Sequence, residues 1–325
     1  MRKAEVFAVS GLDDLAALED DWKAVYRADP HATVFTSWPW LWGRLAALTE
    51  TWWVLVARAE GGPVVGLLPL RTEASILSMA GSPLADYTGF LCTPGWEEAA
   101  LAAFAVHVRE RLSWRRLELS DVLDPRLDAF LGHFPEPAFR TVRLPPTPCP
   151  RLELEDDWDV FLRLRVQSRR RQTLRRKLRA IERLPGFRIT SVDDGGEAQV
   201  ATLLGLWQRR WGELPESELA QFRSVFLSCL KSGCLWLDVV WDGDVPLAGL
   251  LALLDRDRSC FRFYVSGFDE RYAAFSPGSV IVAHSIREAI RCGFRTYDFL
   301  RGDEPYKSSF GARLEHSENV AVARA

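Results

Sequence analysis

The sequence predicts an α/β protein with mixed sheets, built from two copies of one unit. In this unit a hairpin is followed by a strand, a helix and a second strand. Residues 53–70, WVLVARAEGGPVVGLLPL, align without a gap on residues 236–253, WLDVVWDGDVPLAGLLAL. In both halves an aromatic, β-branched segment, an apolar-periodic segment and another β-rich segment then follow in the same order. A weak internal repeat of this length indicates two similar domains.

The composition excludes several classes of protein. With 325 residues, 48% of them apolar and 26% charged, the chain is long enough for two ordinary globular domains. The net charge of −3 gives no overall attraction to nucleic acid or anionic membrane. Six scattered cysteines without a CxxC pair predict buried, reduced thiols and no metal site. The chain lacks a signal-peptide core and an apolar run of membrane-spanning length, so we expect a cytoplasmic protein with no membrane span.

The first copy occupies the N-terminal half. In chain order we expect a helix, an aromatic segment, a hairpin, a loop leading into a strand, a helix and a strand, at residues 12–26, 35–42, 52–71, 82–92, 97–112 and 114–119. The aromatic segment carries Trp38, Trp40 and Trp42, which either pack beneath the sheet or form a wall of a substrate pocket. The proline-rich run 145–150 suits neither helix nor strand. We therefore place the boundary there, giving domains 1–148 and 149–325.

A strongly basic helix is predicted between the two copies, at residues 158–184. Its apolar stripe is interrupted over residues 167–173, QSRRRQT, and residues 163–183 include ten basic side chains and one acidic one. Like charges at this density repel one another unless an anion or an acidic partner offsets them. Two interpretations stand: the helix binds an anionic ligand, or its charges pair with acidic neighbours such as Glu155 on a solvated face.

The second copy ends in the stretch with the most chemistry. We expect a buried strand at 261–268, a helix that Ser276 caps and Pro277 begins, a strand at 295–300, and a polar turn at 301–307. A helix N-terminus has free N–H groups and a partial positive charge. This helix is therefore suited to hold an anionic cofactor beside the polar turn.

Three segments resemble a known family: FTSWPWL at 35–41, YVSGFDERYAAFSPG at 264–278 and YDFLRGDEPYK at 297–307. Together they look like the GNAT-type acetyltransferases of the cellulose-biosynthesis (CelD/BcsL) family, which is similar to the FemAB-type peptidyltransferases with tandem GNAT folds. The resemblance covers about residues 4–311. It implies two GNAT-like domains, with acyl transfer from a thioester to an amine or hydroxyl in the second one.

The resemblance also implies where the acyl donor binds. In a GNAT domain two strands splay apart to take a pantetheine arm, and the next helix N-terminus takes the pyrophosphate. Carried onto this chain, the donor residues are Val265, Ser266, Gly267, Ser276, Pro277, Gly278 and Ser279. The usual glycine-rich acetyl-CoA loop is absent. The donor is therefore an acyl-CoA, an acyl carrier protein or an aminoacyl-tRNA, and the acceptor a small molecule or saccharide.

The chemistry needs a base and a donor for the oxyanion. No Ser or Cys of the last segments has a His nearby on its own element, so we expect direct attack by the acceptor. Asp298 lies in an apolar strand, where burial raises the pKa of a carboxyl, so it is either the base or a structural partner of Arg301 or Lys307. Lys307 and Arg301 are the candidate cations for a phosphate or the oxyanion, and Tyr306 is a candidate proton donor or stacking surface.

The first copy has no lysine at the matching turn and looks chemically incomplete. We expect its Asp86 and Tyr87 to line an acceptor site between the domains, and Arg169, Arg170 and Arg171 to bind the carrier of the donor. Two alternatives remain. One is a FemAB-like transferase whose arginine-rich helix meets tRNA phosphates; the other is a non-catalytic double-GNAT module that holds RNA or an acidic protein.

Overall fold

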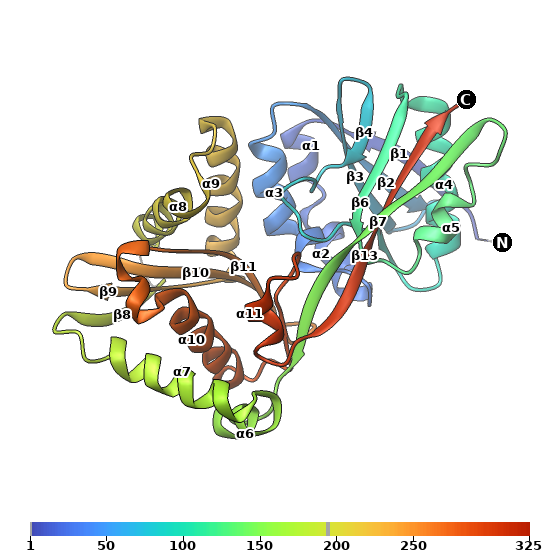
Figure 1. Ribbon diagram of the computed structural model, residues 1–325. Helices are drawn as coiled ribbons and strands as arrows, with labels where there is room; N and C mark the ends of the chain where they lie inside the picture. Colours follow the sequence, from blue (N-terminus) through green and yellow to red (C-terminus); the bar gives the residue numbers. More distant parts are fainter. Residues whose placement is uncertain (1, 193–195) are drawn as a thin grey trace. The chain divides into compact units, whose positions relative to one another are not determined.

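The computed structural model describes residues 2–192 and 196–325, which form two compact units (Figure 1). Unit 1 consists of Met1–Thr147 and His316–Ala325, and unit 2 of Pro148–Glu315. The last ten residues thus group with the first unit, whereas the sequence analysis assigns all of 149–325 to one domain. Within the described ranges no helix is both long and apolar enough to cross a membrane.

Unit 1 contains the first hairpin and the helices that cover it. Its elements are β1 (Ala4–Val9), α1 (Leu12–Ala16), α2 (Glu19–Ala28), η1 (Val34–Thr36), α3 (Trp38–Ala46), β2 (Thr51–Ala59), β3 (Val64–Glu73), β4 (Ile76–Met79), β5 (Leu91–Cys92), α4 (Glu97–Arg111), β6 (Arg116–Val122) and α5 (Leu127–Leu131). The predicted hairpin at 52–71 is confirmed as β2–β3. The strand order is β1-β2-β3-β4-β6, and only the β4–β6 pair is parallel.

The aromatic segment of unit 1 forms helix α3 and is largely buried. Trp40 is fully buried, and Trp38 packs edge-on against Trp22 of α2 at a ring-centroid distance of 5.7 Å. Arg44 at the end of the same helix is also buried and donates hydrogen bonds to the carbonyls of Ala80 and Ser82. These contacts support the packing interpretation of the tryptophans, since their rings fill the interior of unit 1.

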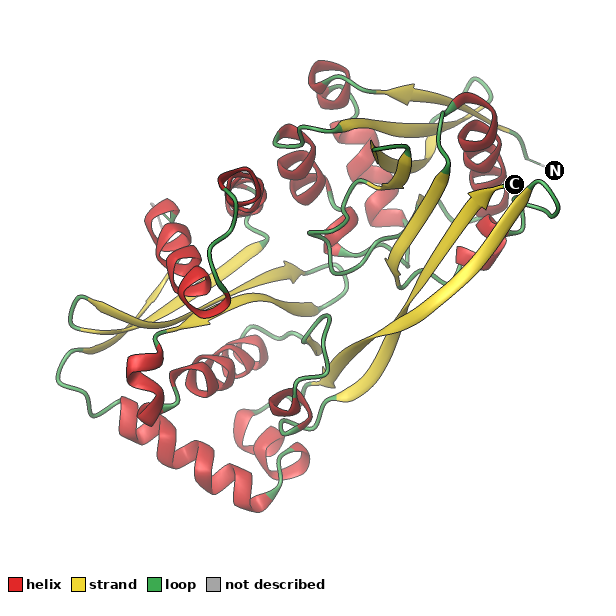
Figure 2. Cartoon of the chain, turned by 45° about the horizontal axis from the view of Figure 1, so that its top comes forward, coloured by secondary structure: helices red, strands yellow, loops and turns green. Residues whose placement is uncertain are grey.

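Unit 2 repeats the arrangement (Figure 2). Its elements are α6 (Trp158–Arg165), α7 (Ser168–Ile181), β8 (Phe187–Ser191), α8 (Glu197–Trp211), α9 (Glu216–Lys231), β9 (Leu235–Asp242), β10 (Val245–Asp255), β11 (Cys260–Phe268), η2 (Glu270–Phe275), α10 (Pro277–Arg291), β12 (Thr296–Asp298) and α11 (Pro305–Ser308). The second predicted hairpin is confirmed as β9–β10. The strand order is β12-β11-β10-β9-β8, again with one parallel pair, β11–β12.

Both faces of the central strands of unit 2 are covered. Helix α10 contacts β9, β10 and β11, while α8 contacts the same strands and α9 contacts β9. Strand β10 is accordingly almost continuously buried from Leu247 to Asp255 and reads as an uninterrupted apolar run. Gly267 allows the closest approach, because a Cβ there would lie 2.5 Å from the backbone carbon of Leu206 in α8.

The proline-rich run is part of a strand, so the prediction that it suits neither helix nor strand is wrong. Strand β7 (Phe139–Glu153) and strand β13 (Arg313–Arg324) each run from one unit into the other and pair with each other. Proline lacks an N–H but keeps its carbonyl and an extended-compatible φ. In unit 2 Pro150 accepts the N–H of Phe299, and Pro148 accepts that of Gly302. These two prolines thus take part in backbone pairing only as hydrogen-bond acceptors.

The basic segment is two helices, not the single helix that the sequence predicts. Helix α6 ends at Arg165, and α7 begins at Ser168. Arg171 donates hydrogen bonds to the carbonyls of Leu162, Arg163 and Val166 at 3.1, 2.9 and 2.8 Å. A guanidinium that caps the last carbonyls of a helix stabilises its end. The gap in the apolar stripe therefore marks a break in the helix.

Candidate active site

Strands β11 and β12 separate after three paired residues. Their parallel pairing joins Cys260, Phe261 and Arg262 to Thr296, Tyr297 and Asp298 and then stops. On the other side β11 stays paired with β10, but the register shifts between Phe263 and Val265, leaving Tyr264 as a bulge. A bulge bends its strand and often lies beside a functional site. Beyond Arg262, β11 therefore presents a backbone edge that β12 does not cover.

The bulge is fixed by packing. The ring of Tyr264 lies 5.9 Å from that of Phe226 and 6.4 Å from that of Phe222, both on α9. Three residues further on, Gly267 lies against the backbone of α8. These contacts hold the end of β11 against α8 and α9. The packing of unit 2 therefore keeps this end of β11 apart from β12.

Helix α10 begins next to this open edge. Ser276 is the N-cap residue in the left-handed conformation (φ 52°), and Pro277 is the first helical residue. Gly278 is required by close packing, because a Cβ there would lie 2.9 Å from the ring of Phe268. As predicted, a 15-residue helix thus begins at the SPG sequence, with its positive end near the end of β11.

A pocket of about 470 Å³ lies where these elements meet. It is lined by Arg210, Trp211, Ser266, Phe268, Ala273, Ser276, Gly278, Ser279, Val282, Glu304 and Tyr306. Of the donor residues predicted from the sequence, it includes Ser266, Ser276, Gly278 and Ser279. Val265 is buried and Gly267 contacts α8, so these two support the strand without lining the pocket.

The end of α8 contributes two lining residues that the sequence analysis missed. The guanidinium of Arg210 lies 4.8 Å from the ring centroid of Phe268 and 5.2 Å from that of Trp211, and it pairs with Glu270. Trp211 is 63% exposed, which is unusual for tryptophan. The signal in the sequence is an arginine and a tryptophan directly before Gly212, the residue that ends the helix.

The polar turn after β12 forms the opposite wall of the pocket. Lys307 is only 3% exposed, although its sequence context predicts a solvated residue. Its ammonium donates to the carbonyls of Arg301 and Gly302 at 2.6 and 3.1 Å and lies 2.8 Å from Oε2 of Glu304. Tyr306 is half-buried. Burial raises its pKa, and the charge of Glu304 raises it further, so the phenol stays protonated well above pH 10.

Asp298 is buried away from the pocket lining. One of its oxygens accepts the N–H of Leu300 at 2.9 Å, and the other lies 3.8 Å from Nε of Arg262. Arg262 in turn pairs with Asp255 at 2.7 Å. Arg262 is thus a partner of Asp298 that the sequence analysis does not name. Arg301 is half-buried and does not line the pocket either.

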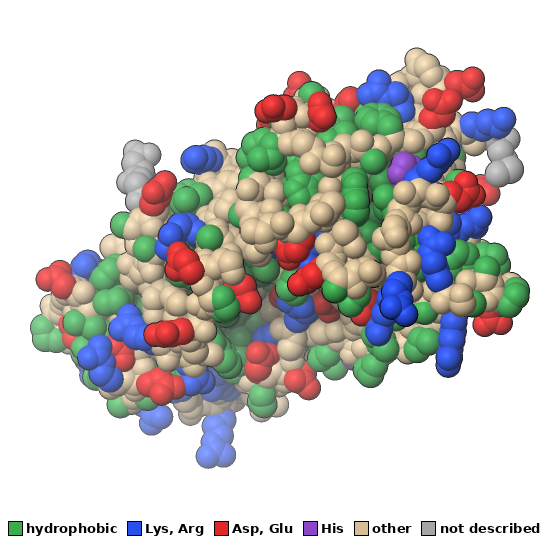
Figure 3. Space-filling model, turned by 90° about the horizontal axis from the view of Figure 1, so that it is seen from above, with side chains coloured by type: hydrophobic (Ala, Val, Ile, Leu, Met, Phe, Trp, Pro, Cys, Tyr) green, Lys and Arg blue, Asp and Glu red, His purple; other side chains and the backbone are tan. Residues whose placement is uncertain are grey.

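The three consecutive arginines of α7 have different surroundings. Arg169 is exposed, Arg170 lies over the ring of Phe310 at 5.8 Å, and Arg171 caps α6. Only part of this triplet therefore faces outward. Among the residues that the structure describes, Arg169, Arg176 and Arg179 have no acidic side chain within 4 Å. On the face drawn in Figure 3, positive and negative side chains are interspersed.

Unit 1 closes the corresponding place with its own chain. Strand β4 ends at Met79, and only Leu91 and Cys92 return to pair with β3, so the predicted strand at 87–92 is shorter than expected. In between, Thr88 bridges to Val122 beside β6 and donates its hydroxyl to the carbonyl of Ser120 at 2.6 Å. Tyr87 is buried against Phe35, and Asp86 is half-buried.

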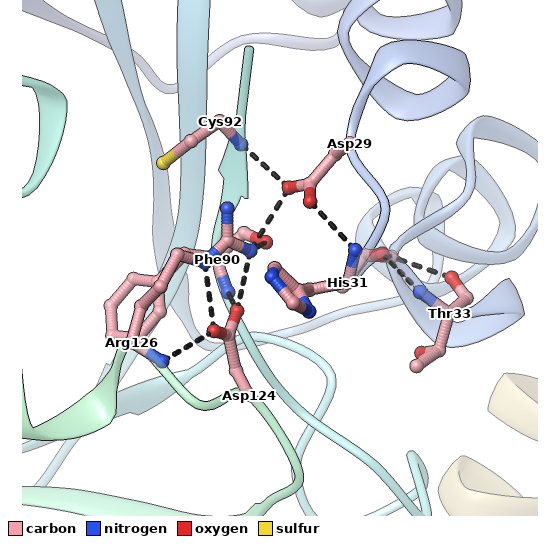
Figure 4. Close-up of polar contacts among 8 residues, drawn as sticks. Asp29, His31, Thr33, Phe90, Cys92, Asp124 and Arg126 are labelled. Atoms are coloured by element: carbon pink, nitrogen blue, oxygen red, sulfur yellow. Dashed lines mark hydrogen bonds and ion pairs between the residues drawn. The ribbon is translucent and has the colours of Figure 1, made fainter. Parts of the chain in front are cut away.

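A buried charge cluster holds this closed arrangement together (Figure 4). Arg126 lies 3.0 Å from Asp29 and 2.6 Å from Asp124, and the three residues are 9%, 0% and 5% exposed. The two carboxylates also accept the N–H groups of Cys92 and Phe90, at 2.8 and 3.1 Å. The cluster thus ties α2, β5 and the end of the looped segment to the turn after β6.

Comparisons with known proteins agree with this geometry. Residues 168–308 match the acetyltransferase (GNAT) domain family. The match lies within unit 2 and includes the pocket and the polar turn. No curated protein matches the chain.

Solved structures extend the likeness to both units. FemX aligns with a TM-score of 0.65 and 15% identity over 93% of this chain and 95% of its own. The C-terminal domain of a putative lysylphosphatidylglycerol synthetase from Agrobacterium fabrum gives 0.60 and 11% over 95% and 93%. A tandem GNAT protein from the clavulanic acid biosynthesis pathway gives 0.57 and 13% over 98% of both chains. The chain has the tandem GNAT fold.

Proposed function

We propose that unit 2 transfers an acyl group from a thioester, in the first place acyl-CoA, to an amine or hydroxyl of a small molecule or saccharide by direct attack. The observation that carries the proposal is the uncovered edge of β11 beyond Arg262, which meets the N-terminus of α10 in one pocket. The GNAT match over 168–308 supports the same chemistry.

The pocket offers the contacts that such a donor needs. The amides of a pantetheine arm pair with a strand edge as an added strand does, here along Ser266 to Phe268. A diphosphate is favoured at the positive end of α10, beside Ser276 and Ser279. Arg210 adds a cation and Trp211 a flat surface at the rim.

Tyr306 is suited to stabilise charge and not to give up its proton. A phenol whose pKa is raised above the ordinary tyrosine value is a weak acid but still a hydrogen-bond donor. We assign it to the negative charge that develops on the carbonyl oxygen or the leaving thiolate. Asp298 and Arg301 support the fold of the strand and the turn in this scheme.

The finer family assignment is also a proposal. The three segments that resemble the CelD/BcsL family lie in η1–α3, in β11–α10 and in β12–α11. The cytoplasmic location and the use of a carrier protein stay predictions of the sequence. An aminoacyl-tRNA donor is the second candidate, since Arg169, Arg176 and Arg179 lack acidic partners among the described residues and phosphates would supply them.

The experiment fills the proposed donor slot. Ser266→Tyr places a bulky ring in the unit 2 pocket, and the matched control Ser120→Tyr places one in a pocket of about 420 Å³ in unit 1. Binding of acetyl-CoA is measured by calorimetry, and acyl transfer by CoA release with a panel of amines and amino sugars. We expect Ser266→Tyr to weaken binding at least about tenfold, roughly 1.4 kcal/mol, and Ser120→Tyr to behave as the wild type.

Equal loss in both variants, or none in either, would contradict a donor slot in unit 2. If acetyl-CoA does not bind while an aminoacyl-tRNA donor is used with a steep dependence on salt, the second candidate replaces the first.

A further inference from the structure

Glu304 is the carboxylate that lines the pocket, in the part of the chain that the structure describes. Its side chain is 47% exposed, so a bound acceptor can reach it. Tyr306, two residues later, lines the same pocket, and burial first and the charge of Glu304 second raise its pKa. Asp298, which the sequence suggests as the base or a structural partner, is buried, lies 3.8 Å from Arg262 and does not line the pocket. The pocket thus has an acceptor of protons at a position that sequence reasoning passed over.

Lys307 holds this carboxylate in place. The ammonium group has three N–H donors, and three oxygens surround it: those of Arg301, Gly302 and Glu304. Because Lys307 is almost completely buried, its charge needs all of these partners. The ion pair uses Oε2 of Glu304, and a carboxylate keeps lone pairs on its second oxygen for a proton.

Gly302 leaves the space that the carboxylate occupies. Its φ is 102°, and a Cβ there would lie 2.6 Å from Oε2 and 3.1 Å from Oε1 of Glu304. A larger residue at 302 would therefore displace the carboxylate as well as strain the backbone. In this turn Lys307 provides a cation next to the Glu304 carboxylate, and Gly302, which has no side chain, leaves room for it.

We propose that Glu304 is the general base of the transfer and that Lys307 and Gly302 are its positioning residues; this rests on the function proposed above. The acceptor nitrogen or oxygen attacks the thioester carbonyl and forms the new bond to carbon. Its proton passes to Glu304, the carbon–sulfur bond breaks, and the thiolate leaves. Tyr306 donates a hydrogen bond during this step and keeps its proton, and Glu304 returns the acceptor proton to solvent.

Charged and titratable groups from two elements lie near Glu304. On its own turn these are Lys307 and Tyr306, and on α8 the pocket-lining Arg210, whose charge is paired with Glu270. Loss of the Lys307 ammonium removes the ion pair that fixes Glu304 in the turn. The value of kcat should then fall while the KM for acetyl-CoA stays the same, a split that a purely structural lysine would not produce.

The test measures kcat, the KM for acetyl-CoA and the pH–rate profile, with the best acceptor from the panel of amines and amino sugars. Glu304→Gln should lower kcat at least about a hundredfold, leave the KM for acetyl-CoA within about twofold, and remove the acid limb. Lys307→Met should lower kcat about tenfold and leave the KM for acetyl-CoA within about twofold. If Lys307→Met does not fold, Gly302→Ala tests the same positioning, because it displaces the carboxylate.

Gly212→Ala is the control for backbone strain, since Gly212 has a φ of 101° and open space where a Cβ would be. It should leave kcat unchanged while Gly302→Ala lowers it. If the wild type is active and the Glu304→Gln variant is equally active or keeps the acid limb, Glu304 is not the base. The proposed function would stand in that case. A wild type that transfers from neither acyl-CoA nor aminoacyl-tRNA would overturn the proposed function and this inference with it.

Discussion

The two units share one supersecondary arrangement, but the edge of one strand is open in unit 2 and closed in unit 1. In both, a hairpin is followed by a strand that begins a parallel pair, β4 with β6 and β11 with β12. In unit 2 that strand continues past the pair with one bulged residue and leaves its edge open. In unit 1 it is interrupted by residues 80–90, and Thr88 of this insertion pairs beside β6. This insertion thus decides whether the edge stays open or is filled by the chain itself.

The nature of the stabilising groups differs accordingly. Unit 1 holds its closed edge with a buried cluster of one arginine and two aspartates. Unit 2 places its charged residues Arg210 and Glu304 at a pocket wall, where a ligand can meet them. Substitutions in the two places should therefore have different effects. In the buried cluster of unit 1 they should lower stability, and at the pocket of unit 2 they should lower activity.

The largest effect is expected for Arg126→Met. It leaves the carboxylates of Asp29 and Asp124 buried without their cation, which costs about 3–5 kcal/mol of the free energy of unfolding. Urea unfolding followed by circular dichroism measures the loss. The exposed Arg140, on β7, provides the control Arg140→Met, which should change stability by less than about 0.5 kcal/mol. Similar values for the two variants would mean that the cluster does not hold unit 1 closed.

The next effect concerns the two tyrosines that the sequence places at the site. Tyr306→Phe removes a hydrogen bond to developing charge and should lower kcat about a hundredfold, roughly 2.7 kcal/mol. Tyr87→Phe should leave kcat within about twofold, because Tyr87 is buried against Phe35 in unit 1. Steady-state rates of CoA release compare them. A comparable loss with Tyr87→Phe would give unit 1 a part in the reaction.

The same tyrosine gives a pH dependence with a definite sign. Because its pKa is raised, Tyr306 stays in the hydrogen-bond-donating form throughout the ordinary tyrosine range. The wild-type rate should therefore show no fall attributable to a phenol between about pH 9 and pH 10.5. A fall in that range that Tyr306→Phe abolishes would show that the phenol ionises as an exposed tyrosine does.

The smallest effect separates two neighbouring arginines of α7. Arg171→Gln removes three hydrogen bonds to the end of α6 and should cost about 1–2 kcal/mol, discounted because the side chain is half-buried. Arg169→Gln, at an exposed position of the same helix, should cost almost nothing. Thermal unfolding distinguishes them. If the pair behaves alike, the cap is not a source of stability and the break between α6 and α7 needs another cause.

Much of the fold follows from local patterns. Alternation and the internal repeat predict both hairpins, and the Ser-Pro-Gly sequence predicts the start of α10, because turn chemistry and the preference of proline for the first helical position are read from neighbouring residues. The side-chain cap expected from Ser276 does not form. The break after α6 is not predicted, since the cap comes from the side chain of Arg171. The extended path of β7 is missed because proline statistics ignore that Pro148 and Pro150 still accept hydrogen bonds.

The candidate site is predicted in position but not in roles. Ser276, Gly278, Ser279 and Tyr306 line the pocket as their sequence context suggests. Lys307 was expected in solvent because its neighbours are polar, yet backbone carbonyls satisfy its charge inside the turn. Arg210 and Trp211 come from α8, about 55 residues before the Ser266 strand, and only the tertiary fold brings them to the pocket. Sequence patterns show which residues are polar; they do not show which carbonyls will face them.

The six cysteines differ in their access to thiol reagents. Cys234 is half-buried, and its hydrogen bond with Cys229 lowers its pKa, so it can react as well. Cys92, Cys149, Cys229 and Cys260 are buried, and burial raises the pKa of Cys92 and of Cys260 to about 12. Thiol reagents attack the thiolate, so these positions should be inert in the folded protein. Cys292 is exposed at the C-terminal end of α10. A maleimide fluorophore there would sit roughly 15 Å along the helix from Val282, the pocket-lining residue of α10 nearest to it, a distance at which it can report donor binding without obstructing it.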